Sequence, residues 1–292
     1  MLGEECMCVK RFLLVFMFMN IVLFTAACRP NDASGGHTNT IIVAGSTTVT
    51  PVMRELALVF EAEHRGVSIE VQELGTSAGI NATLQGVSDI AMSSRAITQD
   101  EQAQGIMPIA FAIDGIAVVV HPHNPVRNLS LEEITAVFRG EITNWQALGG
   151  NNHEITVVSR EEGSGIRTTF ETFASVQDPH QVRDKVIMAS AVSRRAIICQ
   201  GTGAVIAAVS DNPNAIGYVT TGVVAPGFDA VSINGVHFSE QAVLEGTYAF
   251  ANTFFIGVMD DLSDAARDFV AFILSDEGQS VVRKSGYVRF VS

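Results

Sequence analysis

The chain has 292 residues, of which 47% are hydrophobic, so it is long enough for two domains of ordinary size, each with its own core. Its formal net charge of −13 at pH 7 argues against a nucleic-acid partner, because such proteins need a basic face to neutralise phosphates. A small anionic ligand remains compatible with this charge, since hydroxyl and amide donors that converge on one site set the local potential.

The N-terminus has the pattern of a targeting signal. Two basic residues, Lys10 and Arg11, precede an apolar run of 16 residues, 12–27, and then Cys28. Thr25-Ala26-Ala27-Cys28 resembles the bacterial lipobox, which predicts a lipoprotein signal peptide over 1–27, lipidation of Cys28 and a flexible tether over 28–39. The protein would then be extracytoplasmic and anchored to the cell membrane. A single transmembrane anchor is the alternative, but a spanning helix needs about 20 residues.

Three strands with polar, small residues at their carboxyl ends follow. Residues 41–44, 67–71 and 89–92 are apolar or alternating runs typical of strands, and the first two lead into helices. The polar residues that follow the strands are Ser46-Thr47-Thr48, Gly75-Thr76-Ser77-Ala78-Gly79 and Ser93-Ser94-Arg95. The alternation predicts an α/β fold with mostly parallel sheets, in which ligands bind outside the carboxyl ends of the strands.

A second unit of the same kind begins after a predicted strand at 115–120. Ser130 and Glu133 have the spacing of a capping box that opens a helix, and Gly140 ends that helix. The next predicted elements are a strand at 155–159, helices opening at Gly165 and Gly201, a strand at 216–219, a helix at 239–244, a strand at 253–258 and two C-terminal helices.

The strand at 155–159 leads into the stretch of the chain that is best suited to bind an anion. Arg160 follows the strand and offers a bidentate charged donor. Gly163-Ser164-Gly165-Ile166 then opens a helix whose first N–H groups are unsatisfied. Hydroxyls beside helix N-termini also occur at residues 46–48 and 76–77. Ordinary N-capping remains an alternative for each stretch taken alone.

Eight segments in order resemble the substrate-binding component of the bacterial phosphate ABC transporter, over essentially the whole mature chain. They are 44–49, 75–80, 89–95, 114–118, 142–145, 159–165, 214–218 and 275–279. The resemblance implies a two-lobed type II periplasmic-binding-protein fold, with lobe I at 40–117 and 250–292 and lobe II at 118–249. It implies a monomer that closes over one dehydrated phosphate without catalysis, cofactor or metal and delivers it to a membrane permease.

The same resemblance assigns the donors. Thr47, Thr48 and Thr76 match hydroxyl or amide donors of one lobe, with Ser46 and Ser77 in the same segments. Arg160, Ser164 and Gly165 match those of the other lobe, with Glu162 as the acid that holds Arg160. The family usually has Thr where this chain has Ile166, so we expect donation there from the backbone N–H alone.

The acceptor for the phosphate proton is open at this stage. Ser94 stands where some members have an aspartate, whose acceptor-only carboxylate repels fully ionised sulfate. Our hypothesis is that Asp114 or Ser94 takes the proton and that Arg95 supplies extra positive charge. The missing aspartate leaves sulfate, molybdate or tungstate as alternative ligands.

Other functions have weaker support in the sequence. A phosphoester-acting enzyme would need a metal cluster or an activated nucleophile, and neither is evident. His121 and His123 could bind a metal, but a solvated loop is the default. Gly201-Thr202-Gly203 begins like a dinucleotide fingerprint without its third small residue. A sensor or surface lipoprotein that retains the fold without transport also remains open.

Overall fold

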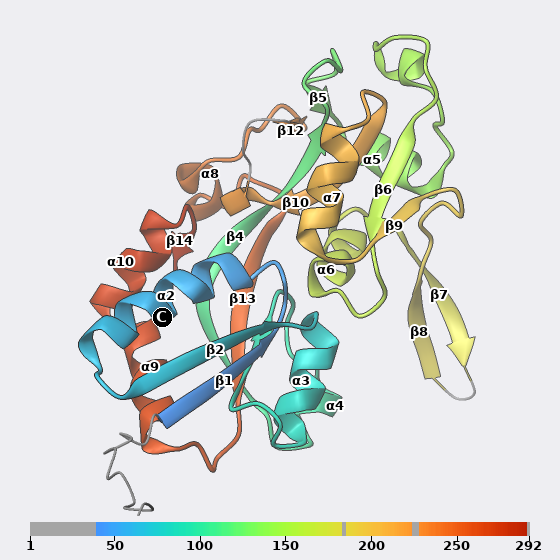
Figure 1. The fold of residues 1–292 in the computed structure, drawn as a ribbon. Coiled ribbons are helices and arrows are strands. Elements are labelled where there is room, and N and C mark those ends of the chain that lie inside the picture. Colours follow the sequence, from blue (N-terminus) through green and yellow to red (C-terminus); the bar gives the residue numbers. More distant parts are fainter. Residues whose placement is uncertain (1–38, 183–184, 224–227, 291–292) are drawn as a thin grey trace, which may run out of the picture. The chain divides into compact units, whose positions relative to one another are not determined.

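The computed structural model describes residues 39–182, 185–223 and 228–290 (Figure 1). The predicted signal peptide, Cys28 and the tether up to residue 38 lie outside the described residues. Asn39, the last residue of the predicted tether, is the first residue of strand β1. None of the helices in the described ranges is both long and apolar enough to cross a membrane.

The first three predicted strands are confirmed. Strands β1 (Asn39–Gly45), β2 (Val67–Glu73) and β3 (Ile90–Ser93) pair in parallel in the order β2-β1-β3. Helices α2 (Thr50–Glu63) and α3 (Thr76–Leu84) follow β1 and β2. The carboxyl ends of β1 and β3 therefore meet at one edge of the sheet.

Two long strands run through the middle of the sheet (Figure 1). Strand β4 (Met107–Val120) pairs antiparallel with β13 (Ala251–Val258) up to Gly115, and with β10 (Ala215–Thr220) from Ile116 onward. The sequence predicted only the second part of β4, because the first part, although apolar over 107–113, contains Pro108 and is separated from the second by Asp114 and Gly115. Strand β4 thus changes partner between Gly115 and Ile116.

The second unit also has a parallel core. Strand β6 (Thr156–Arg160) pairs in parallel with β10 and with β9 (Ile197–Cys199). Its helices are α5 (Leu131–Arg139), α6 (Gly165–Phe173) and α7 (Gly201–Ser210). The predicted capping box is present at the start of α5, and Gly140 ends that helix in the left-handed conformation.

Several short elements complete the sheet and its connections. The sequence did not predict the antiparallel hairpin of β7 (Gln177–Val182) and β8 (Lys185–Ser190), whose first strand is polar and contains Pro179. The remaining strands are β5 (Asn128–Leu129), β11 (Asp229–Ala230), β12 (Ser232–Ile233) and β14 (Val288–Arg289). The remaining helices are α4 (Gln99–Gln102), η1 (Trp145–Leu148), η2 (Thr221–Val223), α8 (Glu240–Leu244), α9 (Asp264–Leu274) and α10 (Asp276–Lys284).

Each unit packs around a large core of its own. One core joins β1, α2 and α9 around Phe60 and Phe269, and the other joins α5, α6 and β10 around Phe138 and Phe170. We call the unit containing β1–β3 lobe I and the unit containing β6, β9 and β10 lobe II. In lobe II the Phe170 ring stacks on Tyr218 with centroids 4.0 Å apart, and the Tyr218 hydroxyl accepts from the backbone N–H of Arg160. The core therefore fixes the end of β6.

Candidate functional site

Hydroxyl groups of lobe I meet where β1 and β3 end and α3 begins. Ser46, which follows β1, donates to Ser94 Oγ over 2.9 Å. Thr76, at the start of α3, has its hydroxyl 3.3 Å from Ser94 Oγ. All three side chains are buried. The predicted meeting of these segments at one sheet edge is therefore found in the structure.

Arg160 of lobe II reaches this group from the opposite side. Its side chain is 2% exposed, and its Nη2 donates to Thr47 Oγ1 of lobe I over 3.0 Å. Its Nη1 donates to Thr202 Oγ1 of lobe II over 3.2 Å. We call the set Ser46, Thr47, Thr48, Thr76, Ser94, Arg160, Ser164 and Thr202 the hydroxyl–arginine cluster.

The acid that holds Arg160 is Glu161, and the prediction of Glu162 was wrong. Glu161 accepts from Arg160 Nε and Nη2 over 2.7 and 2.8 Å, whereas Glu162 is exposed in the turn before α6. The Glu161 backbone N–H donates to the Cys199 carbonyl, which continues the pairing of β6 with β9 and turns the carboxylate along the guanidinium. Burial alone would raise the pKa of Glu161, but hydrogen bonding and the charge of Arg160 hold that pKa below its usual value.

Thr202 is a member of the cluster that our sequence analysis missed. Its hydroxyl lies 3.3 Å from Thr47 Oγ1 and 3.4 Å from Thr48 Oγ1, in addition to its bond with Arg160. It lies at the start of α7, directly after the short strand β9. The same order of strand, small polar turn and helix had marked the other junctions, so this signal was present in Gly201-Thr202-Gly203.

Four helices point uncapped N-termini toward this region. Helices α2, α3, α6 and α7 begin beside the cluster, and none of them has a side-chain hydrogen bond at its N-cap. Helices α4, α5, α8, α9 and α10, which begin elsewhere, are all capped by a Ser or Thr side chain. Ordinary N-capping therefore does not explain the hydroxyls of the cluster. Some of their first N–H groups already have partners, since the Gly201 N–H donates to Glu161 Oε2 and the Ser77 N–H to the Gly163 carbonyl. The positive dipole ends still favour an anion.

The two lobes touch directly at the cluster. The Ser77 backbone N–H of lobe I donates to the Gly163 carbonyl of lobe II over 3.2 Å. A Cβ atom on Gly165 would overlap the hydroxyls of Thr76 and Ser94, so the backbone of α6 approaches lobe I as closely as glycine allows. Ser164 Oγ is buried and has no hydrogen-bond partner within the described residues. The lobes are thus closed on each other, and the Ser164 hydroxyl remains available as a donor to a ligand.

Two predicted site residues, Ile166 and Arg95, have their side chains directed elsewhere. The Ile166 side chain is 1% exposed and packs in the core of lobe II, which leaves only its backbone for a ligand. Arg95 forms a two-pronged ion pair with Glu101 over 2.7 and 2.9 Å. The Arg95 guanidinium also donates to Ser77 Oγ over 3.3 Å. Its charge is therefore largely balanced at the edge of the cluster.

Asp114 lies in β4 beside the point where that strand changes partner. Its Oδ1 accepts from Thr221 Oγ1 over 2.8 Å. No hydrogen bond in the described structure joins Asp114 to the hydroxyl–arginine cluster. Of the two candidate proton acceptors, only Ser94 is brought into the cluster.

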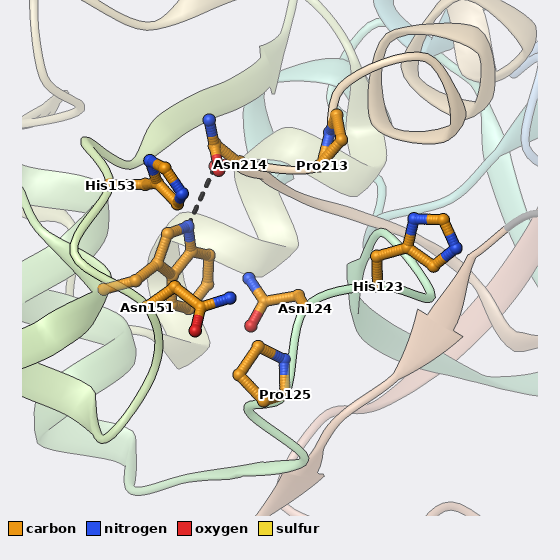
Figure 2. A pocket seen from close by; sticks show the side chains of 8 residues that line it. His123, Asn124, Pro125, Asn151, His153, Pro213 and Asn214 are labelled. Carbon is orange, nitrogen blue, oxygen red and sulfur yellow. Dashed lines mark hydrogen bonds between the residues drawn. The ribbon is translucent and has the colours of Figure 1, made fainter.

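Lobe II has a separate pocket of about 130 Å³ (Figure 2). Its wall includes Trp145, whose Nε1 donates to the Asn214 carbonyl over 3.0 Å, and Asn124, which is 3% exposed. His123 and His153 also line it. No group of three or more His, Cys, Asp or Glu side chains suited to a metal was found in the ranges that the structure covers. The pocket shares no residue with the hydroxyl–arginine cluster.

Two lobes that bring donors together between them define a ligand-binding protein. A family model described as "PBP superfamily domain" matches residues 31–277, which is most of the chain. The chain therefore belongs to the PBP superfamily, and within it to the group of phosphate ABC transporter substrate-binding proteins.

The relatives and solved structures agree with this assignment. The chain is 25% identical over 287 residues to the phosphate-binding protein PstS of Borreliella burgdorferi, covering 96% of this chain and 98% of that protein. A candidate phosphate ABC transporter substrate-binding protein from Clostridium perfringens, solved with bound phosphate, is 35% identical and has a TM-score of 0.80. That match covers 87% of this chain and all (100%) of the other. An ABC-type phosphate transport receptor from Vibrio cholerae is 31% identical with a TM-score of 0.70, covering 86% and 100%. The expected type II fold is confirmed.

Proposed function

We propose that this chain binds inorganic phosphate outside the cytoplasm and delivers it to the permease of an ABC transporter. The observation that carries the proposal is the hydroxyl–arginine cluster, where a buried guanidinium, hydroxyls of both lobes and four uncapped helix N-termini meet. Such a set supplies donors without a hydrolytic base. The phosphate bound to the Clostridium perfringens protein, which is similar over its whole length, supports the same ligand.

Neutral donors give the ligand most of its contacts in this proposal. Glu161 already balances the charge of Arg160, so a phosphate dianion would be held chiefly by hydrogen bonds and helix dipoles. Hydrogen bonds to a charged group contribute about 1.5–3 kcal/mol each, and several of them suffice for tight binding. Because the lobes close over the anion, a permease that recognises the closed conformation would recognise the phosphate-bound protein.

Calorimetric titration of the full-length protein with phosphate, sulfate, molybdate and tungstate tests the ligand. We expect phosphate to bind most tightly. Tighter binding of any of the other three anions would replace phosphate in the proposal. One observation favours these three anions, which is that the cluster contains Ser94 rather than a carboxylate.

Ser94 is the residue we assign to accept the phosphate proton. Its hydroxyl can also donate, so it rejects sulfate less sharply than a carboxylate would. We expect Ser94→Ala to bring the phosphate and sulfate affinities closer together. Ser93→Ala is the matched control, because the Ser93 hydroxyl donates to the Arg95 carbonyl and lies outside the cluster. An unchanged affinity ratio in Ser94→Ala would remove Ser94 from this role.

The membrane attachment is a proposal from the lipobox-like sequence. Cys28 would carry the lipid, with residues 1–27 removed and the folded body acting as a monomer at the membrane surface. Cys28→Ser should release the protein from the membrane fraction, and mass spectrometry of the native N-terminus should show an acylated Cys28. An unmodified N-terminus ahead of Cys28 would contradict the anchor.

A further inference from the structure

A second polar group lies away from the hydroxyl–arginine cluster, where the lobes join. Asp114 immediately precedes Gly115, after which β4 leaves β13 and pairs with β10. Its side chain is fully buried, at 0% exposure. Thr221, which follows β10, donates to Asp114 Oδ1 over 2.8 Å and accepts from the Gly115 N–H over 3.2 Å. The carboxyl group thus ties the end of β10 to the crossing strand.

Three buried oxygens at this crossing lack hydrogen-bond partners among the described residues. They are Asp114 Oδ2, Thr220 Oγ1 and the Tyr287 hydroxyl. The Thr220 side chain lies close enough to influence the pKa values of both Asp114 and Tyr287. Thr220 belongs to β10 of lobe II, and Tyr287 directly precedes β14, which pairs with the lobe I part of β4. The group therefore spans the joint and is incompletely paired in the closed arrangement.

Among the described residues, no cation pairs with this carboxylate. The titratable groups that face it are two phenols, Tyr248 and Tyr287, whose pKa values burial raises, so both stay neutral. The Tyr248 hydroxyl donates to the Ile116 carbonyl over 2.9 Å. None of the ion pairs within the described residues includes Asp114. Burial raises the pKa of Asp114 to about 7, although the hydrogen bond from Thr221 and the nearby polar groups of Thr220 and Gly115 oppose the rise.

The crossing is also connected to the hydroxyl–arginine cluster. Asn252 of β13 stands directly opposite Asp114 in the strand pair. Its side-chain amide donates to the Ser94 carbonyl over 2.9 Å, and Thr169 of lobe II donates to the same carbonyl over 3.2 Å. Rotation of the lobes about the crossing would therefore move the Asp114 group and the support of Ser94 together.

We propose that Asp114 is a positioning residue of the hinge, which takes up a proton when the lobes close. Opening the lobes separates Thr221 and Tyr248 from the crossing strand and admits water to the carboxylate, which then ionises readily. Closing buries the group without a cation and favours its protonated form. Phosphate binding, which needs the closed form, is thereby strengthened as the pH falls.

The sign and size of the effect follow from linkage. A group that binds its proton near pH 7 in the closed form, and much lower in the hydrated form, strengthens closure progressively below pH 7. Between pH 8 and pH 6 it raises the ligand affinity by about tenfold. Phosphate itself also titrates in this pH range. The contribution of Asp114 is therefore the difference between the pH dependence of phosphate affinity in the wild type and in Asp114→Asn.

The test is calorimetric titration of the full-length protein with inorganic phosphate at pH 6, 7 and 8. Buffers of different ionisation enthalpy give the number of protons taken up on binding. The wild type should take up more protons than Asp114→Asn at pH 7. Its affinity should gain about tenfold more than that of Asp114→Asn between pH 8 and pH 6. Asp260→Asn, which alters an exposed aspartate, is the matched control and should follow the wild type.

Equal proton uptake by the wild type and Asp114→Asn would overturn the inference. Thr221→Val provides a second variant should Asp114→Asn fail to fold. Without the Thr221 hydroxyl the ionised carboxylate loses a donor, so the pH response should move to higher pH, and an unmoved response counts against the inference. The inference rests on the proposed function, but the two fail differently, because a wild type that binds no phosphate at any pH refutes the function itself.

Discussion

The Glu161 carboxylate accepts two hydrogen bonds from the Arg160 guanidinium, over 2.7 and 2.8 Å. The Arg160 side chain is 2% exposed and that of Glu161 16%. The pair therefore places a neutralised cation, rather than a free positive charge, beside the hydroxyls of lobe I. Loss of the Glu161 charge should therefore affect the stability of the empty protein and that of the phosphate-bound protein differently.

Glu161→Gln should destabilise the empty protein more than the phosphate-loaded protein. Removing one partner of a buried ion pair leaves the other charge uncompensated, and partial exposure of Glu161 reduces the cost to about 1–3 kcal/mol. Phosphate then supplies the missing negative charge, so the phosphate affinity should rise by the difference between the two destabilisations, up to about a hundredfold. Denaturant unfolding with and without phosphate measures both effects. Glu162→Gln, at an exposed neighbour, should change neither, and equal destabilisation of both variants would contradict the assignment.

Gly165→Ala should weaken phosphate binding by at least about tenfold. The added methyl group would overlap the hydroxyls of Thr76 and Ser94, which are buried and hydrogen-bonded, so the lobes could not close fully. Gly203→Ala is the matched control, since a Cβ there meets nothing within 4 Å. That control should gain slightly in helix stability and keep its affinity. Wild-type affinity in Gly165→Ala would show that close contact between the lobes is unnecessary.

Thr202→Val should lower phosphate affinity by about two- to tenfold, the value of one hydrogen bond. The Thr202 hydroxyl lies against Arg160, Thr47 and Thr48, so its removal takes one positioned group from the junction of the lobes. Thr172→Val removes an exposed hydroxyl of α6 that donates only to the Thr168 carbonyl. Calorimetry on both variants separates a role at the site from a general effect of losing a threonine.

Asp114 should also affect stability as a function of pH. Its pKa is about 7 in the folded protein, against an ordinary value of 3.8, so the folded form holds a proton that the unfolded form releases between these values. This contribution is complete below about pH 4 and is lost as the pH rises to 7, a total of up to roughly 4 kcal/mol. Relative to Asp114→Asn, the wild type should therefore lose stability from pH 5 to pH 7 in denaturant titrations. A constant difference across that range would mean that Asp114 is ionised throughout.

The sequence by itself determined the alternation of strands and helices and the polar residues at the strand ends. These features depend on local patterns: apolar runs, small residues at turns and the capping box of Ser130 and Glu133. They were enough to predict the α/β fold and most donors of the cluster. The missed hairpin of β7 and β8 has a polar first strand with a proline, so its pairing is decided by the partner strand rather than by local pattern.

Only the tertiary structure decided which of two adjacent acids pairs with Arg160, which distant residue joins the cluster and which acid is buried. Two adjacent acids follow Arg160, and the pairing of β6 with β9 turns Glu161, rather than Glu162, onto the guanidinium. The short strand β9 also carries Thr202 to the cluster, 42 residues from Arg160 in the chain. The sequence offered Asp114 as a candidate acceptor of the phosphate proton, whereas in the structure it is a buried acid beside the point where β4 changes partner. Burial and side-chain contact are products of packing between distant segments, so no local pattern could have assigned them.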